Sequence, residues 1–170
     1  GLRTTSLLID DDILIDCGSG AGDLTWEELG RIRHIFLTHG HLDHITFIPF
    51  LVDSVFDLLV ANPITIHLQQ ETSRIRREHV FNWQIWPDFA KLPDAANPVI
   101  EYDVIAPGQQ VTLKGRQLDV IPVTHTQPAV GFRVQAPGGK SFAFSGDTRN
   151  TDRFLEVLNF PPDLDLLIVE

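Results

Sequence analysis

The run Thr38-His39-Gly40-His41-Leu42-Asp43-His44 constrains this chain more than any other stretch of its sequence. Its imidazole and carboxylate side chains are common ligands for Zn²⁺ and similar ions. His39 and His41 are two positions apart, so both can reach one metal ion from an extended or turning backbone. Asp43 and His44 follow the turn and can reach a second ion nearby. A metal centre explains this pattern better than a group of solvated histidines on a loop.

Length and composition fit one globular domain over residues 1–170, with 43% hydrophobic residues to build a core. No apolar run is long enough to cross a membrane. The net charge of −10 argues against binding long nucleic acid through its phosphates, but it leaves a small phosphorylated substrate open. The single Cys17 excludes an internal disulfide and favours a reducing, cytoplasmic location. A homodimer is left open.

Apolar periodicity predicts alternating strands and helices. A hairpin is expected over residues 6–16, and a short helix over 24–29 with Asp23 or Thr25 as its N-cap. One long helix is expected from Asp43 to Leu59, interrupted only early by Pro49, and a second helix over 71–80. Further strands are expected at 33–37, 64–68, 99–104, 111–113, 117–123, 130–134, 140–144 and 166–169, with an irregular stretch over 81–98.

Two further candidate ligands each follow a predicted buried strand. His125 comes after the apolar run Leu118–Val123, and Asp147 comes after Ser141–Phe144. Either residue alone is more simply explained as a polar strand end or a turn. The histidine run also lies between a strand and a helix, which is where α/β folds place ligands, so the repeated pattern favours one shared site.

HGHLDH matches the H-x-H-x-D-H signature of the metallo-β-lactamase superfamily, and His125 and Asp147 follow in the order that this superfamily uses. The segments HLDHITFIPFLVDS and FNWQIWPDF, with Val123-Thr124-His125, resemble the class II cyclic-nucleotide phosphodiesterases. The resemblance covers essentially the whole chain. It implies an α/β fold of four layers, an αββα sandwich with two sheets face to face and helices outside.

The resemblance also implies a site with two divalent metal ions, zinc before manganese or iron. His39, His41 and His125 would hold one ion. Asp43 and His44 would hold the other, and Asp147 would bridge both. Asp16 would support the histidines from behind, and Cys17 would not be a ligand.

The resemblance further implies that both ends of the domain lie outside these 170 residues. The superfamily fold begins before the first segment seen here, and its last histidine would follow the final strand. No histidine follows His125 in this chain. We therefore expect one ion to bind tightly at the three-histidine site and the second to bind weakly.

The implied function is a metal-dependent phosphodiesterase that opens a 3′,5′-cyclic nucleotide. Two ions would lower the pKa of a shared water to about 7, and the hydroxide would attack phosphorus in line, with Asp43 orienting it as the catalytic residue. The alternatives are another hydrolase of the same fold, such as a tRNA 3′-processing nuclease, a thioesterase or a sulfatase, or a non-catalytic chain that keeps the fold. The charge disfavours the nuclease.

Other conspicuous side chains have simpler explanations. Arg74, Arg76 and Arg77 are expected on a solvated helix face. His34 is expected to face solvent or a hydrogen-bond partner, and His67 and His79 to lie away from the site. Trp83, Trp86 and Phe89 are expected to pack at the core or its edge, and they are the best candidates for stacking on a nucleobase.

Overall fold

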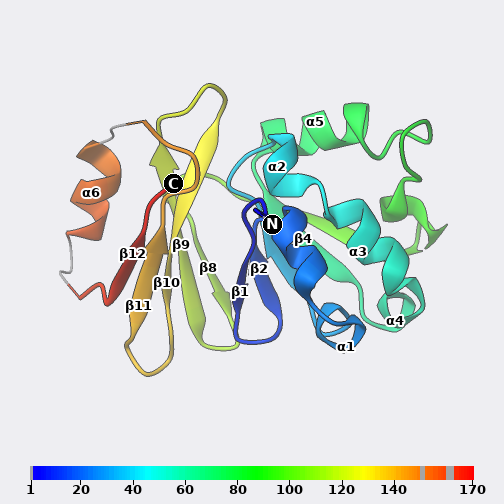
Figure 1. Cartoon of the computed structure of the whole chain (residues 1–170), viewed down its shortest axis with the longest axis horizontal. Helices are drawn as coiled ribbons and strands as arrows, with labels where there is room; N and C mark the ends of the chain where they lie inside the picture. Colours follow the sequence, from blue (N-terminus) through cyan, green and yellow to red (C-terminus); the bar gives the residue numbers. More distant parts are fainter. Residues whose placement is uncertain (1, 150–151, 160–162) are drawn as a thin grey trace. The chain divides into compact units, whose positions relative to one another are not determined.

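Two five-stranded sheets organise the chain, as a computed structural model shows for residues 2–149, 152–159 and 163–170. Contacts divide the chain into a first unit, residues 1–104, and a second unit, residues 105–170. Each unit contains one of the sheets (Figure 1). The prediction of a single domain stays a prediction.

The first sheet has the order β1-β2-β3-β4-β7. Its strands are β1 (Leu7–Ile9), β2 (Ile13–Ile15), β3 (His34–Phe36), β4 (Ile64–Leu68) and β7 (Ile100–Val104). β1 and β2 form the predicted hairpin, and β2, β3, β4 and β7 run parallel. Parallel strands bring their carboxyl ends to one edge, so the segments after β2 and β3 meet there.

The helices of the first unit lie against one face of its sheet (Figure 1). They are α1 (Trp26–Leu29), α2 (Leu42–Ile45), α3 (Ile48–Ser54), α4 (Phe56–Ala61) and α5 (Gln70–His79). Ile35 and Ile66 from the sheet share the core with Leu51, Val52 and helix residues around them. Burial of this apolar face stabilises the unit.

The predicted long helix from residue 43 to residue 59 was wrong, because three short helices occupy this stretch. Pro49 lies in the first turn of α3, where its missing N–H is not needed. Val55 separates α3 from α4, and its φ of −120° and ψ of 22° leave the helical region. The apolar spacing survives these breaks because all three helices bury the same side.

Two other expectations concern helix ends and faces. Thr25, rather than Asp23, caps α1, and it forms a reciprocal capping box with Glu28.

The predicted solvated face over 74–77 was wrong for Arg76, whose side chain is completely buried. Its guanidinium carbon lies 4.5 Å from the centre of the Tyr102 ring and 5.2 Å from that of Phe81. Aromatic side chains from outside α5 therefore surround Arg76, although the helical pattern alone predicts that it is exposed.

The stretch after α5 is mainly irregular, as predicted. It contains the short 3₁₀ helix η2 (Phe89–Lys91) and the two-residue strands β5 (Pro93–Asp94) and β6 (Asn97–Pro98), and another 3₁₀ helix, η1 (Ser19–Asp23), precedes α1. Phe89 is buried and Trp86 packs against the core, whereas Trp83 is 58% exposed. Core packing thus accounts for Phe89 and Trp86.

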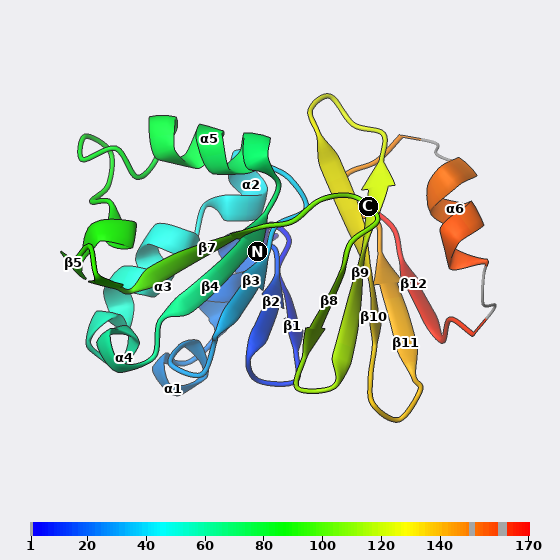
Figure 2. The ribbon, with the colours of Figure 1, turned by 180° about the vertical axis from the view of Figure 1, so that it is seen from behind.

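The second sheet has the order β12-β11-β10-β9-β8 (Figure 2). Its strands are β8 (Gln110–Leu113), β9 (Arg116–Val123), β10 (Ala129–Gln135), β11 (Ser141–Phe144) and β12 (Leu166–Ile168). Neighbours from β8 to β11 run antiparallel, and β12 runs parallel to β11. β9, β11 and β12 therefore all run in one direction and end at the same edge.

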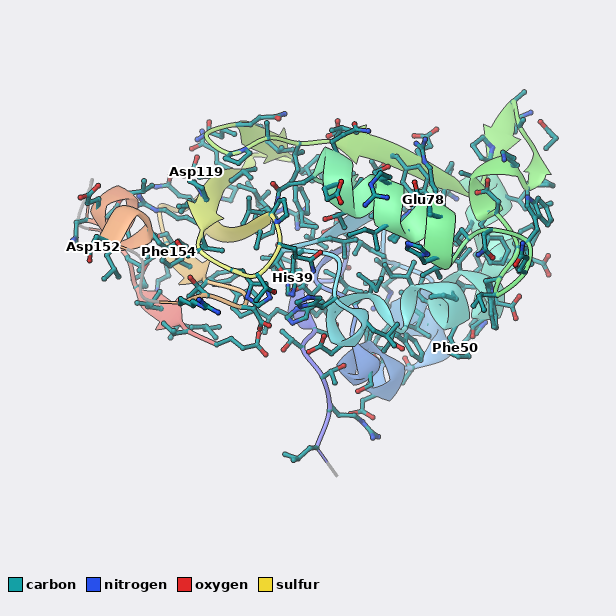
Figure 3. All side chains as sticks on the ribbon, turned by 90° about the horizontal axis from the view of Figure 1, so that it is seen from above. His39, Phe50, Glu78, Asp119, Asp152 and Phe154 are labelled. Carbon is teal, nitrogen blue, oxygen red and sulfur yellow. The ribbon has the colours of Figure 1, made fainter. Side chains whose placement is uncertain are left out.

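Helix α6 (Asp152–Leu158) was not predicted from the sequence. Its Phe154, labelled in Figure 3, joins a buried cluster with Ile121 and Ala143 from the sheet. Gly131 makes room for this ring, since a Cβ there would lie 2.6 Å from a Phe154 ring carbon. The helix is short and its apolar positions are few, so the sequence pattern alone is weak.

Candidate metal centre

The predicted ligands of the first unit follow its parallel strands. Asp16 comes directly after β2, and His39 comes three residues after Phe36, the last residue of β3. His41 is the N-cap residue of α2, which carries Asp43 and His44 in its first turns (Figure 3 labels His39). A strand-to-helix connection thus gathers the cluster at the carboxyl edge of the sheet.

Asp16 connects the buried members of this cluster. Its Oδ2 lies 2.7 Å from Nδ1 of His44 and accepts a 2.8 Å hydrogen bond from the Thr38 hydroxyl. Its Oδ1 accepts a 2.9 Å hydrogen bond from the Thr38 backbone N–H. Burial raises the pKa of the Asp16 carboxyl, and these hydrogen bonds oppose that rise. Asp16 therefore holds Thr38 and His44 in fixed positions.

This hydrogen bonding orients two imidazoles. The only proton of the Thr38 hydroxyl goes to Asp16, so at 3.0 Å the hydroxyl oxygen accepts from Nδ1–H of His39. His44 likewise donates its Nδ1–H to Asp16. In the neutral form of each ring, Nε2 is then unprotonated, as a histidine must be to bind a metal ion through that atom.

His41 completes a group of three imidazoles. Its Nδ1 lies 2.9 Å from Nε2 of His39, and the centres of the His39 and His44 rings are 4.3 Å apart. Asp43 is more open, with a side chain 54% exposed, and its Oδ2 lies 3.6 Å from Nε2 of His44. The first unit thus brings together all four of its predicted ligands.

The backbone around the cluster is unusual at two positions. Asp16 has a φ of +55°, a left-handed conformation that aspartate tolerates better than most residues but that still costs free energy. Gly18 lies so close to the start of α2 that a Cβ there would be 2.2 Å from the Asp43 carbonyl oxygen. Both positions fix the loop that carries the ligands.

In the second unit, His125 and Asp147 lie side by side. They follow β9 and β11, and Nε2 of His125 is 3.6 Å from Oδ2 of Asp147. The Arg149 backbone N–H donates a 2.7 Å hydrogen bond to the Thr124 carbonyl, which ties the two loops together. The strand directions explain this pairing, because β9 and β11 end at the same edge.

Glu170 joins this edge, although the sequence analysis did not single it out. It follows β12, and a carboxylate oxygen of Glu170 lies within 4.8 Å of one of Asp147. The Glu170 backbone N–H donates a 3.1 Å hydrogen bond to the Ser145 hydroxyl. The rule that pointed to His125 and Asp147, a polar residue after a buried strand, could have found Glu170 as well.

The donor chemistry of both units fits divalent metal ions. The first unit offers oriented imidazole nitrogens with a carboxylate behind them, and the second offers an imidazole and two carboxylates. Imidazole and carboxylate suit zinc, manganese and iron, so the residues do not select among these metals. Cys17 is buried, and its thiol is not part of either group.

The fold and these residues define a metallo-β-lactamase-type protein. A model of the beta-lactamase superfamily domain matches residues 11–170, so the chain belongs to the beta-lactamase superfamily. Family members are metal-dependent hydrolases, and their fold implies divalent metal binding. The predicted recognition and the predicted fold class are confirmed.

Three similar proteins illustrate the relationship. The chain is 26% identical over 128 residues to the "Probable 3′,5′-cyclic-nucleotide phosphodiesterase" of Yersinia pestis, covering 71% of this chain and 34% of that protein. It is 32% identical over 130 residues to ribonuclease Z of Bradyrhizobium diazoefficiens, covering 74% of this chain and 40% of that protein. The crystal structure of unliganded yeast PDE1 matches with a TM-score of 0.69 at 18% identity, over 85% of this chain and 45% of that one.

The chain thus spans between a third and two fifths of the two curated relatives. Their names divide between a phosphodiesterase of small cyclic nucleotides and a ribonuclease, so they agree on hydrolysis and differ on substrate. Among the described residues, no helix is both long and apolar enough to cross a bilayer.

Proposed function

We propose that this chain is part of a metal-dependent phosphodiesterase that opens a 3′,5′-cyclic nucleotide. The main observation is the pair of hydrogen bonds that leaves Nε2 of His39 and of His44 unprotonated. The resemblance to cyclic-nucleotide phosphodiesterases supports the substrate class. The strong negative charge of the chain, −10, also favours a small substrate over a long polyanion.

The proposed ligand set follows the family signature. His39, His41 and His125 hold one ion, Asp43 and His44 hold a second, and Asp147 serves both. Glu170 is an additional carboxylate beside Asp147, and the proposed set does not include it. When bound, such ions supply Lewis acidity towards a phosphodiester and a water with a pKa of about 7.

The residues of the chain have separate roles in this proposal. Asp16 and Thr38 keep His39 and His44 in the metal-binding tautomer. The exposed carboxylate of Asp43 accepts a hydrogen bond from the attacking water and holds its proton. No serine or cysteine nucleophile is required, and the buried Cys17 is not placed to act as one.

The decisive experiment combines metal content with substrate choice. The metal-loaded chain is assayed against cyclic AMP, cyclic GMP, a generic phosphodiester and a thioester, and its metal content is measured by mass spectrometry. We expect cyclic-nucleotide hydrolysis that Asp147→Asn abolishes together with part of the bound metal, since an amide does not bridge two cations as a carboxylate does. Asp57→Asn, an exposed carboxylate on α4, is the matched control and keeps both. Full activity in Asp147→Asn would exclude the two-metal proposal.

The number of tightly bound ions tests the ligand set separately. We propose that the chain retains one ion strongly, at the three-histidine site, and the second weakly. Two ions per chain that resist a mild chelator would contradict this proposal and would favour Glu170 as the completing ligand.

A processing ribonuclease is the second candidate, because the Bradyrhizobium relative with that name is 32% identical to this chain. A precursor tRNA added to the same assay distinguishes the two. Cleavage of the RNA without hydrolysis of cyclic nucleotides would replace the first proposal with the second.

A further inference from the structure

A second group of metal-binding side chains lies in the first unit, outside the histidine run. His34, His67 and Asp103 come from β3, β4 and β7, three strands that are neighbours in the sheet. The register pairs Phe36 with His67 and His67 with Asp103, so all these side chains share one face. This face is opposite to the one that Ile35 and Ile66 bury under the helices.

The three side chains form a chain of close polar contacts. Oδ2 of Asp103 lies 2.9 Å from Nδ1 of His67, and Nε2 of His67 lies 3.1 Å from Nδ1 of His34. The His67 ring also stacks on Phe36, with centres 4.0 Å apart and planes 9° from parallel. His67 is almost completely buried and held on both sides, while the side chain of Asp103 is 47% exposed.

Asp103 sets the protonation of His67. Its carboxylate accepts a hydrogen bond from Nδ1–H of the ring, which leaves the Nε2 lone pair directed at Nδ1 of His34. Burial lowers the pKa of His67, and Asp103 partly offsets that effect, so the ring favours its neutral form. The arrangement of carboxylate, histidine and outward lone pair is the one that supports metal-binding histidines in general.

The two imidazole nitrogens lie 3.1 Å apart, so the space between them holds either the Nδ1 hydrogen of His34, in a hydrogen bond to His67, or a metal ion. Bonds from nitrogen to zinc are about 2.0–2.1 Å, and two of them at 90–110° separate their nitrogens by about 3 Å. The observed separation of the two nitrogens therefore fits both on a single ion, once the rings rotate so that both lone pairs point at it.

We infer that His34 and His67 form a second metal site, distinct from the family centre, which takes one borderline divalent ion such as Zn²⁺ or Cu²⁺. Asp103 is a positioning residue that acts through His67. Water molecules complete the coordination, so the site is weaker than one with three or four protein ligands. Protons compete for the same nitrogens, because a metal ligand must be unprotonated.

Zinc titration of the whole chain tests this inference. The chain is first loaded with zinc and desalted, so that only the ions bound tightly at the family centre remain. Further zinc is then followed by calorimetry and by the ¹⁵N signals of the histidine rings. We expect one ion per chain, beyond those that the family centre takes up, whose binding shifts the His34 and His67 ring nitrogens together.

Four variants make the test specific. His34→Asn and His67→Gln each abolish the additional ion, and Asp103→Asn weakens it by about 10–100-fold without removing a ligand. His79→Gln is the control, because His79 is an exposed histidine on α5 and keeps the additional ion. Circular dichroism confirms that each variant is folded, and the half-buried His34 gives a second variant should His67→Gln fail to fold.

Uptake of the same number of ions by His34→Asn, by His67→Gln and by the unmodified chain would overturn the inference. So would the absence of a joint shift of the His34 and His67 ring nitrogens in the unmodified chain, which would leave the pair as a hydrogen bond. The outcome is independent of the proposed phosphodiesterase activity, since no step of the assay uses a substrate.

Discussion

Oδ2 of Asp16 lies 2.7 Å from Nδ1 of His44, and both side chains are completely or almost completely buried. A buried carboxylate is costly unless its oxygens accept hydrogen bonds. Here the carboxylate satisfies the backbone and hydroxyl of Thr38 as well, so one side chain organises the connection from β3 to α2. Asp16 therefore links the stability of this loop to its ability to bind metal.

This link predicts two effects of Asp16→Asn. The amide keeps one acceptor oxygen and places an NH₂ group against a donor, so we expect the free energy of unfolding to fall by about 1–3 kcal/mol. We also expect metal affinity to fall by about 10–100-fold, because His44 and His39 lose their fixed tautomers. Urea unfolding of the metal-free chain and a metal titration measure the two effects separately.

Asp53→Asn is the control for both measurements, since Asp53 is an exposed carboxylate on α3. It should change neither. Unaltered metal affinity in Asp16→Asn, with stability reduced, would mean that Asp16 has only a structural role.

Gly18 provides a second prediction about the same loop. An added Cβ would lie 2.2 Å from the Asp43 carbonyl oxygen and 2.6 Å from that of Thr5, and backbone atoms cannot move as a flexible side chain does. We expect Gly18→Ala to destabilise the chain by about 1–3 kcal/mol and to weaken metal binding, because α2 must shift. Thermal unfolding and the metal titration measure these changes.

Gly138→Ala is the matched control, because no atom lies within 4 Å of a Cβ built there. It should leave stability and metal binding close to those of the unmodified chain. Equal stability of the two alanine variants would show that the segment before α2 adapts more easily than its contacts indicate.

The N-terminus of α1 supplies a third prediction. The Thr25 hydroxyl accepts from the Glu28 backbone N–H at 3.3 Å, and the Glu28 carboxylate accepts from the Thr25 backbone N–H at 2.7 Å. We expect Thr25→Ala to reduce the free energy of unfolding by about 1 kcal/mol. Thr25→Ser keeps the hydroxyl and should restore most of the loss in urea unfolding. A serine variant as unstable as the alanine variant would argue for a role of the Thr25 methyl group.

Local sequence predicted most of the strands, and it predicted that the candidate ligands follow strand ends, for a physical reason. His39, His125 and Asp147 each follow an apolar run, and the end of a buried strand is recognisable from a few residues. Glu170 obeys the same rule after Leu166–Ile168 and was missed because no motif drew attention to it. The predicted ligand set as a whole stays a prediction.

Features that depend on distant partners were not predictable in this way. The breaks around Pro49 and Val55 leave the apolar spacing intact, so periodicity alone indicated one helix. The contact between His34 and His67 depends on the order of strands in the sheet. Arg76 is the clearest case, because a charged residue on a polar helix is normally exposed.

The last prediction concerns Arg76, where the cost of burying a charge opposes the gain from cation–π contacts. Its side chain is completely buried, and none of its guanidinium N–H groups donates a hydrogen bond to another described residue. Burial lowers the pKa of Arg76, which shows that the site disfavours its charge. The rings of Tyr102 and Phe81 offset part of this cost through cation–π contacts, each worth about 2 kcal/mol when desolvated.

Desolvation of a buried charge costs several kcal/mol, so we expect it to outweigh these contacts. Arg76→Met, which keeps the length and the packing of the side chain, should then raise the free energy of unfolding by about 1 kcal/mol. Arg74→Met on the same helix is the control: Arg74 is half-exposed and pairs with Glu71 and Glu78, so its loss should cost no more than about 1 kcal/mol. Urea unfolding of the two variants shows whether the free energy of unfolding rises or falls. A less stable Arg76→Met would mean that the aromatic contacts with Tyr102 and Phe81 outweigh the cost of burying the charge.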